Sequence, residues 1–507
     1  MRHIAQGWTS VSFSEVVAPK SDRVDPKNLP KARYLGLEHV EAHSQRVLGT
    51  VPSSAVSSSS VRFEAGDVLY GRMRPYLNKV VRPDFDGIAS AEFIVFPPSN
   101  AIDSRFLLAR IGSSDFVEFA CSQYEGDRPR VKFDQLAKWS IDLPPLAEQT
   151  RIVAKLEELL SALDAGVAEL KAAQKKLIHY RQSLLKAAVS GDLTAAWREK
   201  NPPQETGQQL LQRILRERRT RWEATQLAKF KAQGKALPTG WKEKYAVPVQ
   251  PDVSKLPQLP DGWVWASGDQ LCDLITKGTT PPKEMKAIGE QTIPFLRVTN
   301  LTSQGTLDLR DEVFVSQAVH TEFLARSIVF PDDVLMNIVG PPLGQVVVAP
   351  NTYSEWNINQ AIAIFRPVDT VLPKFLCRYL LSNVAQKWFA QRAKTTAGQT
   401  NLTLEMCRTL PMPVPPMSEQ IAIVDMCEAV LDSCSQQVVA IEASLKQSTA
   451  QRKNILQAAF SGQLVPQDPT DEPASALLAR IRAAREATSL INPVNRKIPR
   501  GRKAKAV

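Results

Sequence analysis

The chain has 507 residues, a formal net charge of +11, and a hydrophobic content of 43%. This length predicts two or more domains, and with no apolar run of about 18 residues and no apolar leader we expect neither a membrane span nor a signal peptide. Its 6 cysteines lack CxxC spacing and its 5 histidines are scattered, so we expect a reduced, cytoplasmic, metal-free protein and exclude a disulfide scaffold.

Residues 1–142 are expected to form a mixed α/β domain. The segments "RYLGLEHV" (33–40) and "FEAGDVLYGRMRPYLNKVV" (63–81) are short β-branched runs that end in turns, which is typical of strands. The segment "FLLARIGSSDFVEFA" (106–120) has helical spacing. This region has 18 Lys and Arg against 17 Asp and Glu, so binding to nucleic acid would depend on local clusters of charge.

Residues 143–193 predict one long helix. Two prolines mark its start and Ser190-Gly191 its end. Apolar residues recur with a period of seven, as in a coiled-coil seam: Val153, Leu156, Leu160, Leu163, Val167, Leu170, Leu177 and Leu184. A helix packed on a globular core shows a similar stripe, so the stripe alone leaves both interpretations open. About forty residues at about 1.5 Å each give a helix of roughly 60 Å.

Residues 194–259 form a basic linker, because residues 194–247 carry 12 Lys and Arg against 5 Asp and Glu. Leu210, Leu211, Ile214 and Leu215 predict an amphipathic helix within it. Residues 260–413 are expected to form a second α/β domain. Three of its segments resemble those of the first domain in order: "PFLRVTNL" (294–301), "FPDDVLMNIVGPPLGQVVV" (330–348) and "FLCRYLLSNVAQKWFA" (375–390).

Residues 414–465 repeat the long helix. "VPPMSEQIAIV" (414–424) matches "LPPLAEQTRIV" (143–153) at an offset of 271, and the match continues for about fifty residues. The seam consists of Val424, Leu431, Val438, Ile441, Leu445 and Ile455, together with Cys427 and Cys434. Two such helices in one chain favour pairing with each other. Residues 466–507 predict a short helix and a basic disordered tail.

This duplicated organisation resembles the specificity subunit of type I restriction-modification enzymes. The resemblance covers nearly the whole chain. It rests on the paired "LPPLAEQ" and "VPPMSEQ" phrases, the two Ser-Gly helix ends, "LLQRILRERRTRWE" (210–223) and "LPDGWVWASGDQLCDL" (259–274). It implies two target-recognition domains per chain, separated by long antiparallel coiled-coil helices and related by a pseudo-twofold axis. The target would be double-stranded DNA with two half-sites around an unspecified gap that the helices measure.

The same resemblance implies partners that supply the chemistry. Two methyltransferase subunits would dock on the chain and bring S-adenosylmethionine, and restriction and motor subunits would bring ATP and Mg²⁺. The chain itself would be a non-catalytic subunit without a cofactor.

Two other classes of function stay open. A self-contained methyltransferase or nuclease is disfavoured, because the chain has neither a GxG loop nor a GxxxxGK[ST] motif, and "NPPQ" (201–204) lacks the aromatic residue of adenine methyltransferases. Asp261, Glu284 and Lys286 have a nuclease-like spacing that we attribute to chance. A coiled-coil scaffold without sequence-specific DNA binding would leave the two α/β domains without a role.

Base reading requires Arg, Lys, Asn or Gln on loops that reach the edges of a groove. In the first domain we predict Arg72, Arg74, Tyr76, Asn78, Lys79, Tyr124, Arg128, Arg130 and Lys132. In the second domain we predict Lys277, Thr279, Lys283, Lys286, Asn337, Gln345, Arg392, Lys394, Gln399 and Asn401. An ordinary solvated side chain is the alternative for each, and we expect about half of them to be only that.

Overall fold

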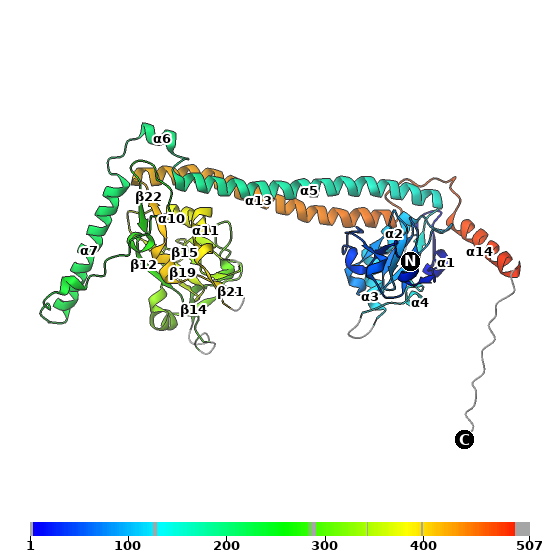
Figure 1. Cartoon of the computed structure of the whole chain (residues 1–507), viewed down its shortest axis with the longest axis horizontal. Coiled ribbons are helices and arrows are strands. Elements are labelled where there is room, and N and C mark those ends of the chain that lie inside the picture. The colour runs from blue at the N-terminus through cyan, green and yellow to red at the C-terminus, as the bar shows by residue number, and fades with distance from the viewer. Residues whose placement is uncertain are drawn as a thin grey trace, which may run out of the picture. The chain divides into compact units, whose positions relative to one another are not determined.

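The computed structural model of the protein describes residues 4–124, 129–282, 285, 290–341, 343–396 and 399–491. The chain forms two compact units. Unit 1 comprises residues 1–170 and 443–507, and unit 2 comprises residues 171–442. Each unit contains one globular α/β domain, and some of the elements are labelled in Figure 1.

The domain of unit 1 contains three small sheets. Its elements are β1 (Thr9–Ser12), α1 (Phe13–Val16), β2 (Arg23–Val24), β3 (Arg33–Leu35), β4 (Val51–Pro52), β5 (Ser60–Phe63), β6 (Val68–Gly71), β7 (Val80–Val81), β8 (Gly87–Ser90), β9 (Phe93–Phe96), α2 (Ser104–Ile111), α3 (Ser114–Ser122), α4 (Phe133–Leu136) and β10 (Ser140–Leu143). The strand orders are β2-β5-β8-β3-β4, β7-β6-β9 and β1-β10. Strands β3 and β8 run parallel, and the other pairs are antiparallel.

The domain of unit 2 follows the same plan. Its elements are β11 (Val264–Ser267), α8 (Gly268–Leu271), β12 (Cys272–Lys277), β13 (Gln291–Leu296), β14 (Phe314–Ser316), β15 (Val334–Asn337), β16 (Val339–Gly340), β17 (Val346–Val348), β18 (Asn357–Ile358), β19 (Ile362–Pro367), α10 (Pro373–Leu381), α11 (Asn383–Arg392), β20 (Lys394–Thr396), β21 (Gln399–Asn401), α12 (Leu404–Thr409) and β22 (Pro411–Val414). The strand orders are β12-β19-β15-β17, β14-β13-β18, β16-β21-β20 and β11-β22. Strands β13 and β18 are parallel, as β3 and β8 are in unit 1.

The three pairs of segments that the sequence predicts to be related occupy matching elements. The first pair forms β3 and β13, and the second forms β6 with β7 and β15 with β17. The third pair is helical, as predicted, but each segment forms two helices. Ser113 precedes α3 and Ser382 precedes α11, since serine is favoured at the N-terminus of a helix.

Both long helices lie within the ranges 143–193 and 414–465 that the sequence indicates, and each is a few residues shorter at both ends. Helix α5 (Leu146–Ser190) and helix α13 (Met417–Phe460) each follow a Pro-Pro pair. Each ends before a glycine with positive φ, +79° at Gly191 and +75° at Gly462, a conformation that most other residues adopt only at a cost.

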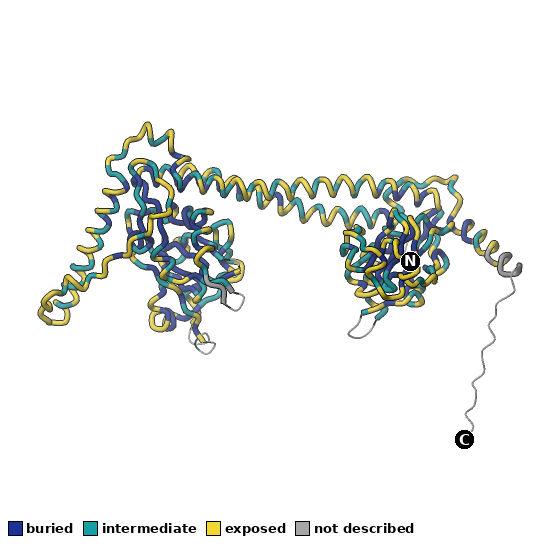
Figure 2. Tube along the Cα trace, viewed as in Figure 1, coloured by how far each residue is buried: buried dark blue, intermediate teal, exposed yellow. Residues whose placement is uncertain are grey.

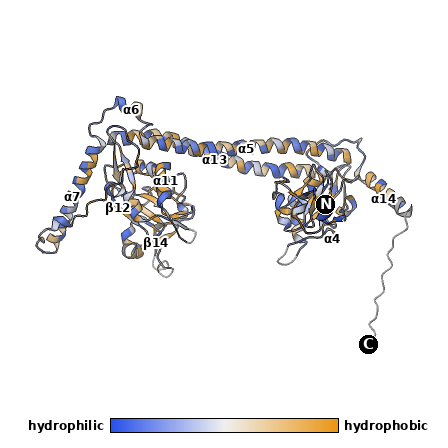
Figure 3. Ribbon diagram, in the orientation of Figure 1, coloured by the Kyte–Doolittle hydropathy of each residue, from blue (hydrophilic) through white to orange (hydrophobic). Residues whose placement is uncertain are grey.

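The apolar seam of each long helix is shielded from solvent. All fourteen predicted seam residues are buried or half-buried, whereas the residues between them are mostly exposed (Figure 2). Hydrophobic and hydrophilic residues are interspersed along both helices (Figure 3). In unit 1, Val153 and Leu156 of α5 join one core with Ala459 of α13. In unit 2, Leu185 of α5 joins another core with Val424 of α13. Within each unit, therefore, segments of both helices pack together on the domain.

In each unit, a further helix after the long helix is joined to the start of the domain by the same backbone hydrogen bond. Helix α6 (Ala195–Lys200) is followed by α7 (Gly207–Ala232), where the amide of Gly207 donates to the carbonyl of Gly262 at 2.6 Å. In unit 1, the amide of Ala474, which begins α14 (Ala474–Ile491), donates to the carbonyl of Gly7 at 3.0 Å. The amphipathic helix predicted around residues 210–215 lies within α7, and residues 492–507 lie outside the described residues.

The repeated Glu-Gln dipeptide ties each long helix to its domain. The indole of Trp8 donates to Oε2 of Glu148 at 3.0 Å, and the indole of Trp263 donates to Oε2 of Glu419 at 2.8 Å. Gln149 accepts from the amide of Asp103, and Gln420 accepts in the same way from the amide of Leu372. The repeated Glu-Gln dipeptide therefore forms the same contacts in both units.

Candidate nucleic-acid interface

In unit 1 the two loops predicted to contact DNA lie side by side. The first follows β6, and the second precedes α4. The amide of Arg74 donates to the carbonyl of Pro129 at 2.8 Å, and the amide of Val131 donates to the carbonyl of Arg72 at 3.0 Å. Arg74 and Asn78 both adopt left-handed backbone conformations, with φ of 51° and 45°. The two loops therefore form one surface from segments about fifty residues apart in the sequence.

Four of the predicted residues on this surface are available to a ligand. Arg74, Tyr76 and Lys132 are exposed. The side chain of Arg130 is 47% exposed, and its Nη2 donates to Glu92 Oε1 at 2.6 Å. A guanidinium with a single carboxylate partner keeps donors for a base edge or a phosphate.

Three other predicted residues of unit 1 form contacts within the fold. Asn78 donates from Nδ2 to the carbonyl of Gly112 at 2.8 Å, and Lys79 donates from Nζ to the carbonyl of Leu37 at 2.6 Å. Asn78 and Lys79 thus have a role in the fold, and their contact with DNA stays a prediction. Arg72 lies near Glu92. Burial is the main cause that lowers the pKa of Arg72, and the positive charge of Arg130 lowers it further.

Two predicted residues of unit 1 remain. Tyr124 is half-buried and packs against the domain core. Arg128 lies outside the described residues.

Unit 2 builds its surface at the matching place. Strand β16 follows β15 and pairs with β21, so that Val339 lies opposite Asn401. The amide of Leu402 donates to the carbonyl of Ile338 at 2.9 Å, which repeats the contact of Val131 with Arg72. In unit 1 the corresponding bridge joins Met73 and Arg130. The structure thus gives the predicted loops of both domains one common arrangement.

The predicted residues of unit 2 also divide into two groups. Lys277 and Arg392 are exposed, and the guanidinium of Arg392 lies 4.3 Å from the ring centroid of Trp388. Thr279 accepts from Nη2 of Arg326 at 2.8 Å. Asn401 is half-buried at the end of β21.

Asn337, which the sequence predicts to contact DNA, is instead buried in the fold. Its side chain is 0% exposed, and its Oδ1 accepts from the amide of Val339 at 3.0 Å. Gln345 is half-buried with a shielded Oε1. The backbones of Lys394 and Gln399 lie in β20 and β21, and Lys283 and Lys286 lie outside the described residues.

Three residues near these surfaces escaped the sequence prediction. The amide of His43 donates to the carbonyl of Asn78 at 3.3 Å, so the exposed loop of His43 and Arg46 borders the first surface. Exposed Arg326 borders the second through Thr279. No motif marks these residues, since only tertiary contacts bring them near the predicted loops.

The described residues give no indication of a metal centre or of a membrane segment. No group of three or more His, Cys, Asp and Glu residues among them could hold a metal ion. No described helix is both long enough and apolar enough to cross a bilayer.

A family model described as the type I restriction modification DNA specificity domain matches the chain twice, at residues 6–174 and 260–447. The chain belongs to this family. Each match contains one globular domain and the beginning of the long helix that follows it, so the repeat of the family's domain coincides with the repeat of the structure.

Two specificity subunits from Escherichia coli are similar to the chain. The EcoDI specificity subunit is 30% identical over 222 residues, which are 42% of this chain and 50% of that protein. The EcoBI specificity subunit is 28% identical over 360 residues, which are 69% of this chain and 65% of that protein. The matches thus span about half and just under two thirds of these relatives.

One solved structure shares the fold over most of the chain. It comes from work entitled "Structural basis underlying complex assembly and conformational transition of the type I R-M system". The match has a TM-score of 0.63 and 21% identity, and covers 91% of this chain and all of that one. At this identity the likeness concerns the fold alone.

Proposed function

We propose that the chain is the DNA sequence-recognition subunit of a type I restriction-modification complex. Each of its two domains reads one half of a split target in double-stranded DNA. The chain itself performs no catalytic step. The observation that carries the proposal is the convergence of the same two loops in both units, within a chain whose family is the DNA specificity domain.

The residues on the two surfaces support different half-sites. In unit 1 the exposed residues are Arg74, Tyr76, Arg130 and Lys132, whereas unit 2 presents Lys277 and Arg392. Arginine favours guanine, and lysine binds both guanine and phosphate. Two domains of one fold that expose different side chains are suited to reading two different sequences.

The two long helices are proposed to pair as an antiparallel coiled coil and to set the length of the unspecified gap. Their inward positions keep the 3-4 spacing of such a seam from Val153 to Leu184 and from Val424 to Ile455. A stiff helix pair can fix a distance along DNA, where sites on one face recur about every 34 Å, but a flexible linker cannot. The repeated contacts of the two units support a pseudo-twofold relation.

A pseudo-twofold chain offers two similar surfaces and thus suits two copies of one partner. We propose that two methyltransferase subunits occupy them and that restriction and motor subunits join through the complex. S-adenosylmethionine, ATP and Mg²⁺ would then be bound by those subunits. A methyltransferase of this kind must flip its target adenine out of the duplex.

The test is methylome sequencing of a host that expresses this chain with its cognate methyltransferase subunit. We expect methylated adenine in two short half-sites around a fixed gap. Replacing residues 1–142 with the corresponding domain of a relative should change one half-site and leave the other half unchanged. If the complex assembles but no new methylation appears, the chain does not read DNA.

A scaffold role is the competing candidate. It predicts tight binding to proteins and no sequence-selective shift of duplex DNA at any salt concentration. A recognition subunit should instead bind its target with an affinity that falls as salt rises, because phosphate contacts release counterions.

A further inference from the structure

The linker between the long helix α5 and the second domain carries a structured projection, which we call the arm (residues 222–247). It begins in the last part of α7, turns after Ala232 and returns through a 3-10 helix at Trp241–Lys244. Trp222 stacks on Trp241 with 5.9 Å between ring centroids, and Tyr245 packs edge-on against Trp222 at 5.4 Å. Glu223 pairs with Lys242 at 3.1 Å. These contacts hold the base of the arm in one conformation.

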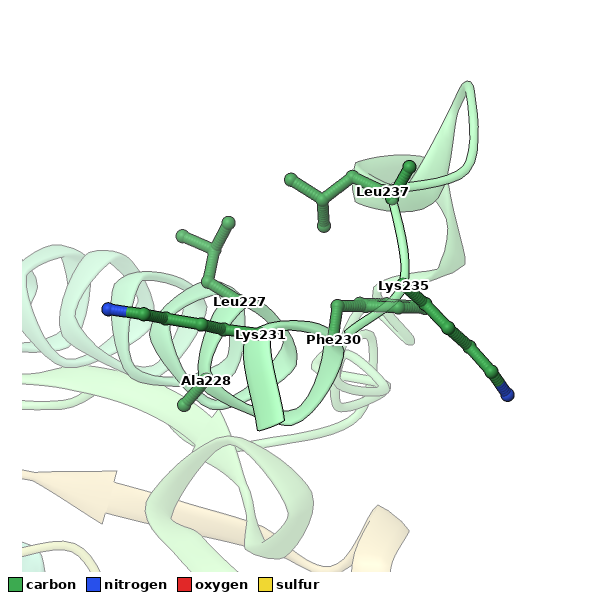
Figure 4. A pocket seen from close by; sticks show the side chains of 7 residues that line it. Leu227, Ala228, Phe230, Lys231, Lys235 and Leu237 are labelled. Atoms are coloured by element: carbon green, nitrogen blue, oxygen red, sulfur yellow. The ribbon is translucent and has the colours of Figure 1, made fainter. Parts of the chain in front are cut away.

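The tip of the arm exposes an apolar hollow of about 420 Å³, lined by Leu227, Ala228, Phe230, Lys231, Lys235, Ala236 and Leu237. Leu227 is 44% exposed and Leu237 is 42% exposed. Figure 4 shows both leucines beside the hollow, with Lys231 and Lys235 extending away from each other at its rim. A preformed apolar hollow of this kind lowers the entropic cost of binding a partner.

The charged side chains around the hollow are all positive. Lys229, Lys231 and Lys235 are exposed, and none of the three forms an ion pair with a described residue. The sequence has no Asp or Glu from residue 224 to residue 242. An apolar floor with a lysine rim complements a segment that is apolar on one side and acidic on the other. DNA backbone would satisfy the lysines but would leave the leucines without a partner.

The tip occurs once in the described chain, although most other elements occur twice. Gly207 of α7 matches Ala474 of α14 by its backbone contact, and the ion pair of Glu205 with Arg213 matches that of Glu472 with Arg480. When α7 and α14 are aligned by these contacts, Ile491 at the end of α14 corresponds to residue 224, just before the tip. The sequence of residues 492–507 does not repeat the leucines and phenylalanine of the tip.

We propose that the arm is a docking site for an acidic amphipathic helix of a partner protein, bound once per chain. This single site differs from the paired surfaces proposed for the methyltransferase subunits and does not depend on which DNA the domains read. The partner would insert apolar side chains between Leu227 and Leu237, and its carboxylates would pair with Lys231 and Lys235.

The experiment measures binding of two synthetic peptides to the full chain by fluorescence anisotropy. Both are 18-residue amphipathic helices with leucines at helical spacing, and their polar side is either glutamate or lysine. We expect the acidic peptide to bind at a ratio of one to one and at least about tenfold more tightly than the basic peptide. Leu227→Ser with Leu237→Ser should weaken that binding by about tenfold or more.

Charge reversal makes the test specific. Lys231→Glu with Lys235→Glu should exchange the preference, so that the basic peptide binds more tightly. Lys255→Glu, an exposed change outside the tip, should leave both affinities unchanged. Near-ultraviolet circular dichroism of the tryptophans reports whether each variant keeps the base of the arm.

Equal binding of both peptides, or none, would overturn the proposal. So would loss of binding to a DNA duplex in the charge-reversed variant while neither peptide binds, because the lysines would then be phosphate contacts.

Discussion

The two matching glutamates that hold the long helices differ in their partners. Glu419 accepts from Trp263, from Oγ1 of Thr194 at 2.6 Å and from Nε of Arg198 at 2.9 Å. Glu148 accepts from Trp8, but its Oε1 is buried without a hydrogen-bond partner among the described residues. Hydrogen bonds thus offset the burial of both carboxylate oxygens of Glu419 but of only one oxygen of Glu148.

We predict opposite effects of one substitution at these two positions. Glu419→Gln should lower the free energy of unfolding by about 1.5–3 kcal/mol, because it removes hydrogen bonds to a charged group and leaves Arg198 without its carboxylate. Glu148→Gln should leave it unchanged or raise it at neutral pH, because it removes a buried charge. Scanning calorimetry of both variants checks this, and equal destabilisation would contradict it.

Stability should also depend on pH through Glu148. Burial raises the pKa of Glu148 above 4.5, against the opposing effects of Trp8 and Arg151. The folded chain therefore binds this proton more tightly than the unfolded chain. The stabilisation is fully present below the unfolded pKa and is lost as pH rises through the folded pKa. Melting of Glu148→Gln should lack this decline, and an identical pH profile in both proteins would contradict the assignment.

Two neighbouring cations of the first surface should separate binding from stability. Arg74→Ala should weaken binding to the cognate duplex by about tenfold without changing the melting temperature, because Arg74 is exposed. Lys79→Ala should lower the melting temperature, because its ammonium group donates to the Leu37 carbonyl. Electrophoretic mobility shifts and calorimetry on the same samples distinguish these roles. Unchanged DNA affinity in Arg74→Ala would remove that residue from the interface.

At the scale of elements, neither of the glycines that follow the long helices has room for a side chain. A Cβ at Gly191 would lie 2.5 Å from Cγ of Pro260, and a Cβ at Gly462 would lie 2.6 Å from Cβ of Ala5. Each residue also has a positive φ. Gly191→Ala and Gly462→Ala should therefore each lower the free energy of unfolding by about 1–2 kcal/mol or more. Gly166→Ala inside α5, where a Cβ meets nothing within 4 Å, is the matched control.

The sequence predicts the long elements better than the interface. Heptad spacing, Pro-Pro starts and glycine ends are local signals, so α5 and α13 follow directly from them. The parallel pairing of β3 with β8 joins segments about fifty residues apart and has no local signature. The same limit applies to the site. Nothing near Asn78 or Lys79 in the sequence reveals that Gly112 and Leu37 accept their hydrogen bonds.

At the scale of the whole molecule, the proposed role of the long helices can be tested by length. One heptad inserted after Leu170 and one after Glu442 would keep both seams in register and add about 10 Å. The unspecified gap of the methylated site should then grow by about three base pairs. Seven residues inserted after Gly234 in the arm should leave the gap unchanged. An unchanged gap after the paired insertion would show that the helices do not measure it.

Because unit 1 is built from two separate stretches of the chain, it can be completed only after unit 2 has been synthesised. Unit 2 is one continuous stretch, residues 171–442, whereas unit 1 also requires residues 443–507. Synthesis proceeds at about 5–20 residues per second, so the ribosome needs roughly 15–55 s to pass from residue 170 to residue 443. During that time Val153 and Leu156 lack Ala459, their later neighbour in the core. The part of the protein made first is therefore finished last.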